Sequence, residues 1–204
     1  MRRKLACFAL AVLSFMSILS VYSYGVSAEA LKLDYHTQLI TASVDASYKQ
    51  INIKLNKIPY LTLDNVLNLD LTKPSNVTVE ELEQVLKQGL SGLAPYFIEA
   101  EKKYSVNCLF LVSIAIIESG WGTKLFRPNN MFGFGQIGFS SKAECIDYVA
   151  SKIAKNYLSA SGPFYYGTKI QNVHTKYATS PTWSTKVGTA MASLYQNIYK
   201  NNQK

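Results

Sequence analysis

The chain has 204 residues, of which 48% are hydrophobic and 17% charged, so it is long enough for one globular domain with a hydrophobic core and is not globally disordered. Three cysteines are too few for a disulfide-built scaffold, and the two histidines lie far apart in sequence, which excludes a structural zinc site. The formal net charge is +8, and residues 92–204 carry 12 basic and 5 acidic side chains. This basic half predicts an anionic partner, and nucleic acid is disfavoured because Arg127 is the only arginine after residue 28.

The N-terminus has the pattern of an export signal. Residues 1–4 are basic, residues 5–24 carry no charge, and small residues at Val26 and Ala28 fit a cleavage site before Glu29. We therefore expect a signal peptide over residues 1–28 and a protein that is secreted or associated with the cell wall. The alternative is an uncleaved membrane tether through residues 5–24, because about 20 apolar residues can span a bilayer.

Residues 29–73 show weaker patterns. The alternation over residues 50–55, together with frequent Asn, Asp and Thr, predicts an irregular or partly β N-terminal extension. The helix-breaking run at residues 73–76 ends it, and we expect the main domain to occupy residues 74–204.

After this break the sequence favours helices. Capping-box patterns begin at Thr78 and Ser141, Pro95 fits the first turn of another helix, and Gly120 closes an apolar run. The predicted helices cover approximately residues 78–88, 95–103, 108–119, 141–157 and 180–198.

Glu118 is the first charged residue of the apolar helix that begins near residue 108. Partial burial and the negative end of the helix dipole would both raise its pKa, as a general acid for glycosidic cleavage requires. The alternative is a glutamate that points into solvent where the helix reaches the surface.

Two turns next to this glutamate carry a family resemblance. Residues 118–123 (Glu-Ser-Gly-Trp-Gly-Thr) and 129–133 (Asn-Asn-Met-Phe-Gly) resemble the signature of the peptidoglycan-cleaving glucosaminidases in the lysozyme-like group. The resemblance extends from about Lys73 to Tyr199 and includes residues 97–104 and 176–183. It implies a mainly α fold of the α+β lysozyme-like type. The short loop at residues 133–140 predicts a reduced second lobe.

The resemblance also implies an activity, namely hydrolysis of the β-1,4 bond that follows N-acetylglucosamine in bacterial wall glycan. Glu118 matches the general acid of the family, and Tyr177 matches a cleft tyrosine that steadies the reacting sugar. We expect substrate contacts at Trp121, Asn129, Asn130, Phe132 and Gly133. Packing beneath the turn is an alternative for Trp121, and capping of the turn is an alternative or additional role for the two asparagines.

The identity of a second carboxylate stays open. Glycosidases with two carboxylates need a partner for the acid, and Glu144 is the nearest candidate after the turn, although it also fits the capping box of its own helix. The other route uses the 2-acetamido oxygen of the substrate as nucleophile, with Tyr177 supporting the intermediate.

Residues 133–138 match the dinucleotide fingerprint Gly-x-Gly-x-x-Gly, but no strand precedes them, so nucleotide binding is disfavoured. Cys108 and Cys145 are expected to be buried thiols, with a disulfide as the alternative.

We expect a monomer that needs no cofactor and whose partners are peptidoglycan strands and anionic wall polymers. The rival functions are a muramidase or lytic transglycosylase, and a non-catalytic wall-binding protein.

Overall fold

The computed structural model describes residues 36–46 and 58–203, which fall in two compact units, residues 1–56 and 57–204. In the first unit, residues 36–46 are helical. The expected signal peptide over residues 1–28 and the alternation over residues 50–55 lie outside the described residues. Among the helices that are described, none has the length and apolar character needed to cross a membrane.

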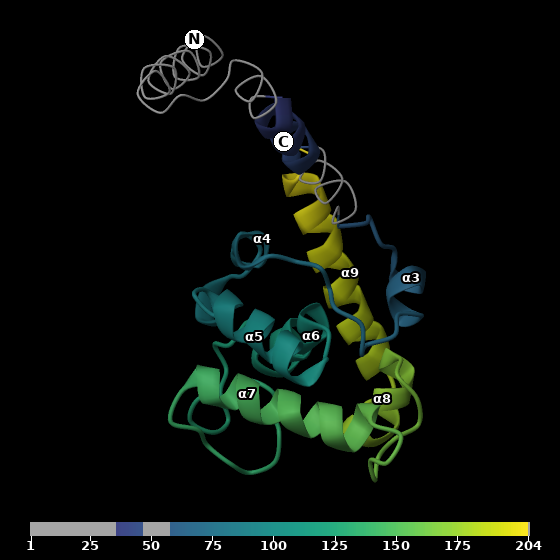
Figure 1. The fold of residues 1–204 in the computed structure, drawn as a ribbon. Helices are drawn as coiled ribbons and strands as arrows, with labels where there is room; N and C mark the ends of the chain where they lie inside the picture. The colour runs from purple at the N-terminus through teal and green to yellow at the C-terminus, as the bar shows by residue number, and fades with distance from the viewer. Residues whose placement is uncertain (1–35, 47–57, 204) are drawn as a thin grey trace. The chain divides into compact units, whose positions relative to one another are not determined.

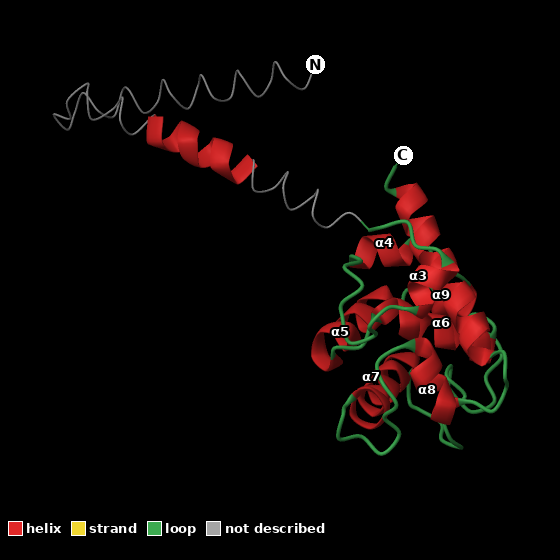
Figure 2. Cartoon of the chain, turned by 90° about the vertical axis from the view of Figure 1, so that its right-hand side faces the viewer, coloured by secondary structure: helices red, strands yellow, loops and turns green. Residues whose placement is uncertain are grey.

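The described part of the second unit consists of helices and loops, without strands (Figures 1 and 2). The mainly α prediction is therefore confirmed, and the second lobe is a loop between Gly120 and Ser141. The helices are α3 (Leu63–Leu67), α4 (Val79–Glu83), the 3-10 helix η1 (Gln88–Leu90), α5 (Ala94–Tyr104), α6 (Cys108–Ser119), α7 (Lys142–Lys152), the π-helix η2 (Ile153–Leu158), α8 (Ile170–Tyr177) and α9 (Trp183–Asn201).

Helix α6 is the centre of the core, and it has the predicted bounds. Its side chains from Cys108 to Ala115 are all buried, and it packs against α5 and α9. The side chain of Asn107 accepts hydrogen bonds from the first free backbone N–H groups, and Gly120 ends the helix in the left-handed conformation, with φ 55°. An apolar run closed by glycine was thus sufficient to predict both ends.

Residues 58–73 are part of the second unit, so the expected domain start at residue 74 lies inside it. Helix α3 packs on α9, and the backbone of Leu71 bonds to Thr168 and Asn107 at 2.8 Å each. No strand occurs in the described residues between 29 and 73, and the alternation at residues 50–55 that suggested one lies outside them. Within the described part, a capping box between Thr62 and Asn65 starts helix α3.

The other predicted helices differ mainly at their ends. The capping box at Thr78 forms, but α4 ends at Glu83 instead of near residue 88. Helix α7 continues into the π-helix η2, so the predicted helix over residues 141–157 is continuous, with Ile146, Val149, Ile153 and Tyr157 buried along it. Helix α9 buries apolar residues at helical spacing, at Trp183, Val187, Met191, Leu194 and Ile198.

Glu101 on α5 is a buried carboxylate that the sequence analysis did not single out. It accepts hydrogen bonds from the backbone N–H groups of Cys108 (2.7 Å) and Ser75 (2.9 Å), and from the Ser75 hydroxyl (3.1 Å). The side chain is 7% exposed. Because Cys108 opens α6, Glu101 satisfies a backbone donor at the positive end of the central helix.

Both cysteines of the second unit are buried and free, which confirms the prediction of thiols. Burial raises the pKa of the Cys108 thiol well above its usual range, and the charge of Glu101 adds to the effect. Burial also raises the pKa of Cys145 to about 11. Both groups are therefore unreactive thiols near neutral pH.

Candidate active site

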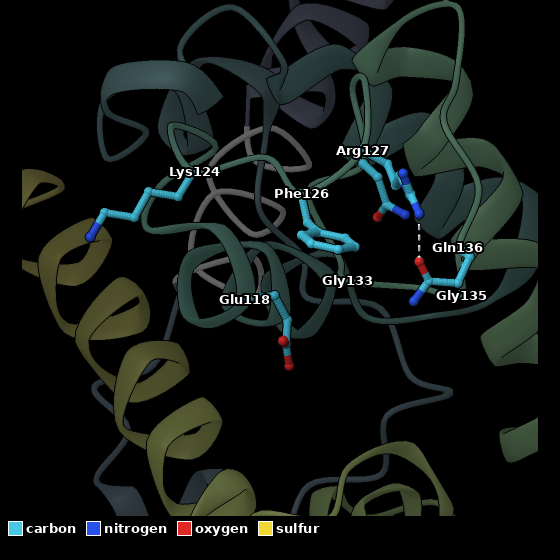
Figure 3. A pocket seen from close by; sticks show the side chains of 8 residues that line it. Glu118, Lys124, Phe126, Arg127, Gly133, Gly135 and Gln136 are labelled. Carbon is cyan, nitrogen blue, oxygen red and sulfur yellow. Dashed lines mark hydrogen bonds between the residues drawn. The ribbon is translucent and has the colours of Figure 1, made fainter.

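Glu118 lies in the last turn of α6 and is exposed, with its carboxylate beside a cavity of about 290 Å³ (Figure 3). The partial burial expected from the sequence is thus not found, because α6 reaches the surface one turn before it ends. The cavity is formed mainly by the loop that follows α6. Its lining residues are Glu118, Lys124, Phe126, Arg127, Asn130, Gly133, Gly135 and Gln136.

The orientation of Glu118 depends on a tryptophan that follows it by 65 residues. The indole N–H of Trp183 donates a hydrogen bond of 2.7 Å to Oε1 of Glu118. Trp183 is the first residue of α9, is 3% exposed, and stacks against Tyr177 with ring centroids 4.9 Å apart. Because Oε1 accepts this bond, Oε2 is the oxygen left to carry or transfer a proton.

Replacing Trp183 with phenylalanine tests this arrangement. Phenylalanine keeps an aromatic ring against Tyr177 but removes the N–H donor, so Glu118 loses its fixed orientation. If the chain cleaves glycan as its motifs imply, kcat should fall about tenfold, the size expected when a charge-assisted hydrogen bond is lost. The measurement is kcat together with the thermal unfolding temperature. An unchanged kcat in a stably folded variant would contradict the role of the hydrogen bond.

Gly133 leaves little room for a side chain beside the other oxygen of Glu118. A Cβ atom at this position would lie 3.2 Å from Oε2 of Glu118. The residue also has φ 59°, a left-handed conformation that favours glycine. Both constraints explain why a glycine stands here, and they bring the backbone of the loop close to the carboxylate.

Asn130 holds this loop in place. Its amide donates to the carbonyl groups of Phe134 (3.0 Å) and Ile137 (2.9 Å), and its side-chain oxygen accepts from the backbone N–H groups of Phe132 and Phe134 (3.2 Å each). These four bonds use the full capacity of the amide, so the turn-capping alternative describes its side chain better than a sugar contact does. Asn129 similarly donates to the carbonyl of Phe139 at 2.9 Å.

Phe132 and Tyr177 connect the loop to α8. The ring of Phe132 is 1% exposed, so the expected contact of this side chain with substrate does not fit the structure. Its carbonyl accepts a hydrogen bond of 3.2 Å from the hydroxyl of Tyr177. Burial raises the pKa of Tyr177 well above its usual range, and the charge of Glu118 adds to this. The tyrosine therefore stays neutral and keeps its hydrogen bond to the loop, although it does not itself line the cavity.

Trp121 and Glu144 are not among the residues that line this cavity. Trp121 is half-buried against the core, with Nζ of Lys87 5.7 Å from its ring centroid, which agrees with packing beneath the turn. Oε2 of Glu144 accepts from the N–H (2.7 Å) and the hydroxyl (2.6 Å) of Ser140. These bonds, led by the hydroxyl, lower the pKa of Glu144. Glu144 therefore caps the start of α7, which explains both its hydrogen bonds to Ser140 and its lowered pKa.

Phe126 and Gln136 were not expected at the site, whereas Lys124 and Arg127, two of the basic groups expected to line or flank the groove, do line the cavity. The guanidinium of Arg127 donates to the side-chain oxygen of Gln136 at 2.9 Å and lies 5.0 Å from the ring centroid of Phe126. The available signal was proximity in sequence to the two family motifs, because Phe126 lies between them and Gln136 follows the second. Across the described residues no group of three or more His, Cys, Asp or Glu could hold a metal ion.

A family model described as mannosyl-glycoprotein endo-beta-N-acetylglucosaminidase matches residues 94–196, which is half of the chain. The chain belongs to this glucosaminidase family. The matched segment contains Glu118, Trp183 and the whole loop between α6 and α7, so the family membership covers the cavity described above.

Individual relatives agree with this assignment. A protein of Streptococcus pneumoniae serotype 4, named putative endo-beta-N-acetylglucosaminidase, is 29% identical over 147 residues, which is 63% of this chain and 22% of that protein. The beta-N-acetylglucosaminidase of Bacillus subtilis is 27% identical over 158 residues, 62% of this chain and 18% of its own length. The chain therefore spans about a fifth of the length of these relatives.

Solved structures show the same fold. Autolysin E of S. aureus matches with a TM-score of 0.58 and 22% identity, covering 67% of this chain and 73% of that chain. A catalytic mutant of that protein in complex with the disaccharide NAG-NAM matches with a TM-score of 0.56 and 22% identity, covering 68% and 73%. The lysozyme-like fold expected from the motifs is thereby confirmed.

Proposed function

We propose that this chain hydrolyses the β-1,4 bond that follows N-acetylglucosamine in peptidoglycan, with Glu118 as the general acid. The observation that carries this proposal is the setting of Glu118. It is the only carboxylate among the residues lining the cavity, and one of its oxygens is fixed by Trp183 while the other faces the loop. The chain is similar in fold to an autolysin that was solved with the disaccharide NAG-NAM. This similarity supports peptidoglycan as the substrate and a location outside the cytoplasm.

The proposed reaction begins with protonation of the leaving glycosidic oxygen. Trp183 occupies Oε1 of Glu118, so Oε2 delivers the proton. Removal of the leaving sugar leaves a cation-like sugar, and the substrate's acetamido oxygen then stabilises it from within the same sugar. We favour this acetamido-assisted route because Glu118 has no second carboxylate beside it in the cavity. Water completes the reaction, with Glu118 now acting as base.

In this mechanism Tyr177 is a positioning residue. Its hydroxyl holds the backbone of Phe132, and its ring stacks on Trp183, which in turn binds Glu118. These contacts thus connect the loop that lines the cavity to the acid. The direct support of the reacting sugar that the family resemblance implies for Tyr177 would use the remaining lone pairs of the same hydroxyl.

The identity of the cleaved bond is tested by digestion of purified peptidoglycan, followed by reduction and mass analysis of the fragments. The proposal expects N-acetylglucosamine at every new reducing end. N-acetylmuramic acid at those ends would identify a muramidase, and its anhydro form a lytic transglycosylase. Absence of soluble fragments, with binding to the wall retained, would favour the non-catalytic alternative.

Replacing Glu144 with glutamine tests the second-carboxylate hypothesis. The structure explains Glu144 by its bonds to Ser140, so the variant should keep kcat within about twofold of the wild type and lose at most about 1 kcal/mol of stability from the helix cap. A loss of 100-fold or more in a folded variant, the usual size for a general base, would instead support an inverting route through Glu144.

A further inference from the structure

Phe126 has an unusual position for a large apolar side chain. It is 78% exposed, which is the highest value among the exposed large hydrophobic residues of the described chain. Single exposed apolar residues are common on protein surfaces, but this one lines the same cavity as the carboxylate of Glu118. Figure 3 shows its ring between Glu118 and Arg127. An exposed ring at this place is suited to pack against the apolar face of a sugar.

Arg127, the next residue, is held ready for an anionic ligand. The ring of Phe126 and the side-chain oxygen of Gln136 contact its guanidinium from two directions. The bond to Gln136 uses one of five N–H donors, and a guanidinium can bind a carboxylate through two parallel hydrogen bonds. A side chain that is braced in this way loses less conformational entropy when it binds.

Cationic side chains outnumber carboxylates around the cavity. Lys124 also lines it, and Glu118 is the only carboxylate that does. The salt bridge found among the described residues joins Lys103 and Asp147 and involves neither of these cations. A second negative group close to Glu118 would be repelled by its carboxylate, and Arg127 and Lys124 offset that repulsion.

The two sugars of the glycan differ in one relevant respect. N-acetylglucosamine is neutral, whereas N-acetylmuramic acid carries a lactyl group that ends in a carboxylate, or in a stem peptide with carboxylates of its own. Under the proposed function the sugar that leaves is N-acetylmuramic acid, and its oxygen must lie within reach of Glu118. The carboxylate-bearing sugar is therefore placed beside the acid.

We propose that Phe126 and Arg127, assisted by Lys124, form a recognition site for the carboxylate-bearing leaving sugar. Phe126 packs against the sugar ring, and Arg127 binds the carboxylate. This inference rests on the proposed function and adds to it a preference for charged over neutral glycan. The preference weakens as salt rises, because ions screen exposed charges.

The test compares three substrates: peptidoglycan, glycan strands whose peptides have been removed so that the lactyl carboxylates are free, and neutral oligomers of N-acetylglucosamine. Arg127→Gln should lower kcat/KM about tenfold on a charged substrate and less than about twofold on the neutral oligomer. Amidation of the lactyl carboxylates with methylamine should make the wild type behave like the variant. Phe126→Ala should lower kcat/KM on all three substrates. Lys102→Gln, an exposed residue of α5 with the same change in charge, is the matched control and should change none of them.

The outcomes distinguish failure of the recognition site from failure of the proposed function. An effect of Arg127→Gln on peptide-free strands identifies the lactyl carboxylate as the ligand, and an effect on intact peptidoglycan alone identifies the peptide carboxylate. Equal losses on charged and neutral substrates, or no loss on any, would overturn the recognition site while leaving Glu118 as the acid. Wild-type protein that cleaves none of the three substrates would contradict the proposed function itself.

Discussion

Glu118→Gln is expected to lower kcat for peptidoglycan cleavage by about a thousandfold, within the range attributed to general acid catalysis. The amide oxygen of glutamine can still accept the hydrogen bond from Trp183, so the side chain keeps its orientation. What it loses is a transferable proton. Because Glu118 is exposed and the substitution preserves its volume, the thermal unfolding temperature should change by only a degree or two.

The measurement is the rate of reducing-end release from purified peptidoglycan, with Glu99→Gln as the matched control. Glu99 is an exposed glutamate of α5 and does not line the cavity, so its amide should behave like the wild type. If Glu118→Gln released fragments at the wild-type rate, Glu118 would not be the acid. The exposed carboxylate at the end of α6 would then have only a structural role.

The second large effect concerns stability. Glu101→Ala should lower the free energy of unfolding by about 3 kcal/mol, because it leaves the buried N–H groups of Cys108 and Ser75 without their acceptor. One of these donors belongs to the first turn of α6, the helix that carries Glu118. The measurement is equilibrium denaturation in urea, and the loss should appear as a lower midpoint with little change in slope.

Glu101→Gln separates the hydrogen bonds from the charge. A glutamine can accept the two N–H groups with its oxygen and donate to the hydroxyl of Ser75, so we expect a loss of only about 1 kcal/mol, from the interaction of the charge with the helix dipole. Glu99→Ala, on the exposed side of the same helix, should change stability by less than about 0.5 kcal/mol. Equal losses for Glu101→Ala and Glu101→Gln would show that the charge, rather than the hydrogen bonds, stabilises α6.

The sequence predicted the elements whose pattern is strong and local. Helix α6 follows from an apolar run closed by Gly120, and α9 from apolar residues at helical spacing. Helix α8 was missed because only Ile170 and Val173 of its eight residues are buried. Helix α3 was missed because its capping box starts with Thr62 and uses Asn65, a weaker signal than a glutamate at that position.

The candidate site was predicted in part. Glu118, Gly133 and Asn130 were chosen from the motifs, and all three line the cavity. The hydrogen bond from Trp183 could not be read from the sequence, because it joins residues 65 positions apart and Trp183 has the spacing of an ordinary core residue. For Asn130 the sequence left two roles open, and only its four bonds to the loop favour the structural one.

The hydrogen bond between Glu118 on α6 and Trp183 on α9 makes the site sensitive to proteolysis between helices. The segment at residues 179–182, between α8 and α9, is exposed, and exposed loops are the preferred sites of proteolytic cleavage. Loss of α9 after such a cut would remove the donor to Glu118 and uncover one side of α6. The proposed activity would then be lost through a cut far from Glu118, with the acid itself chemically intact.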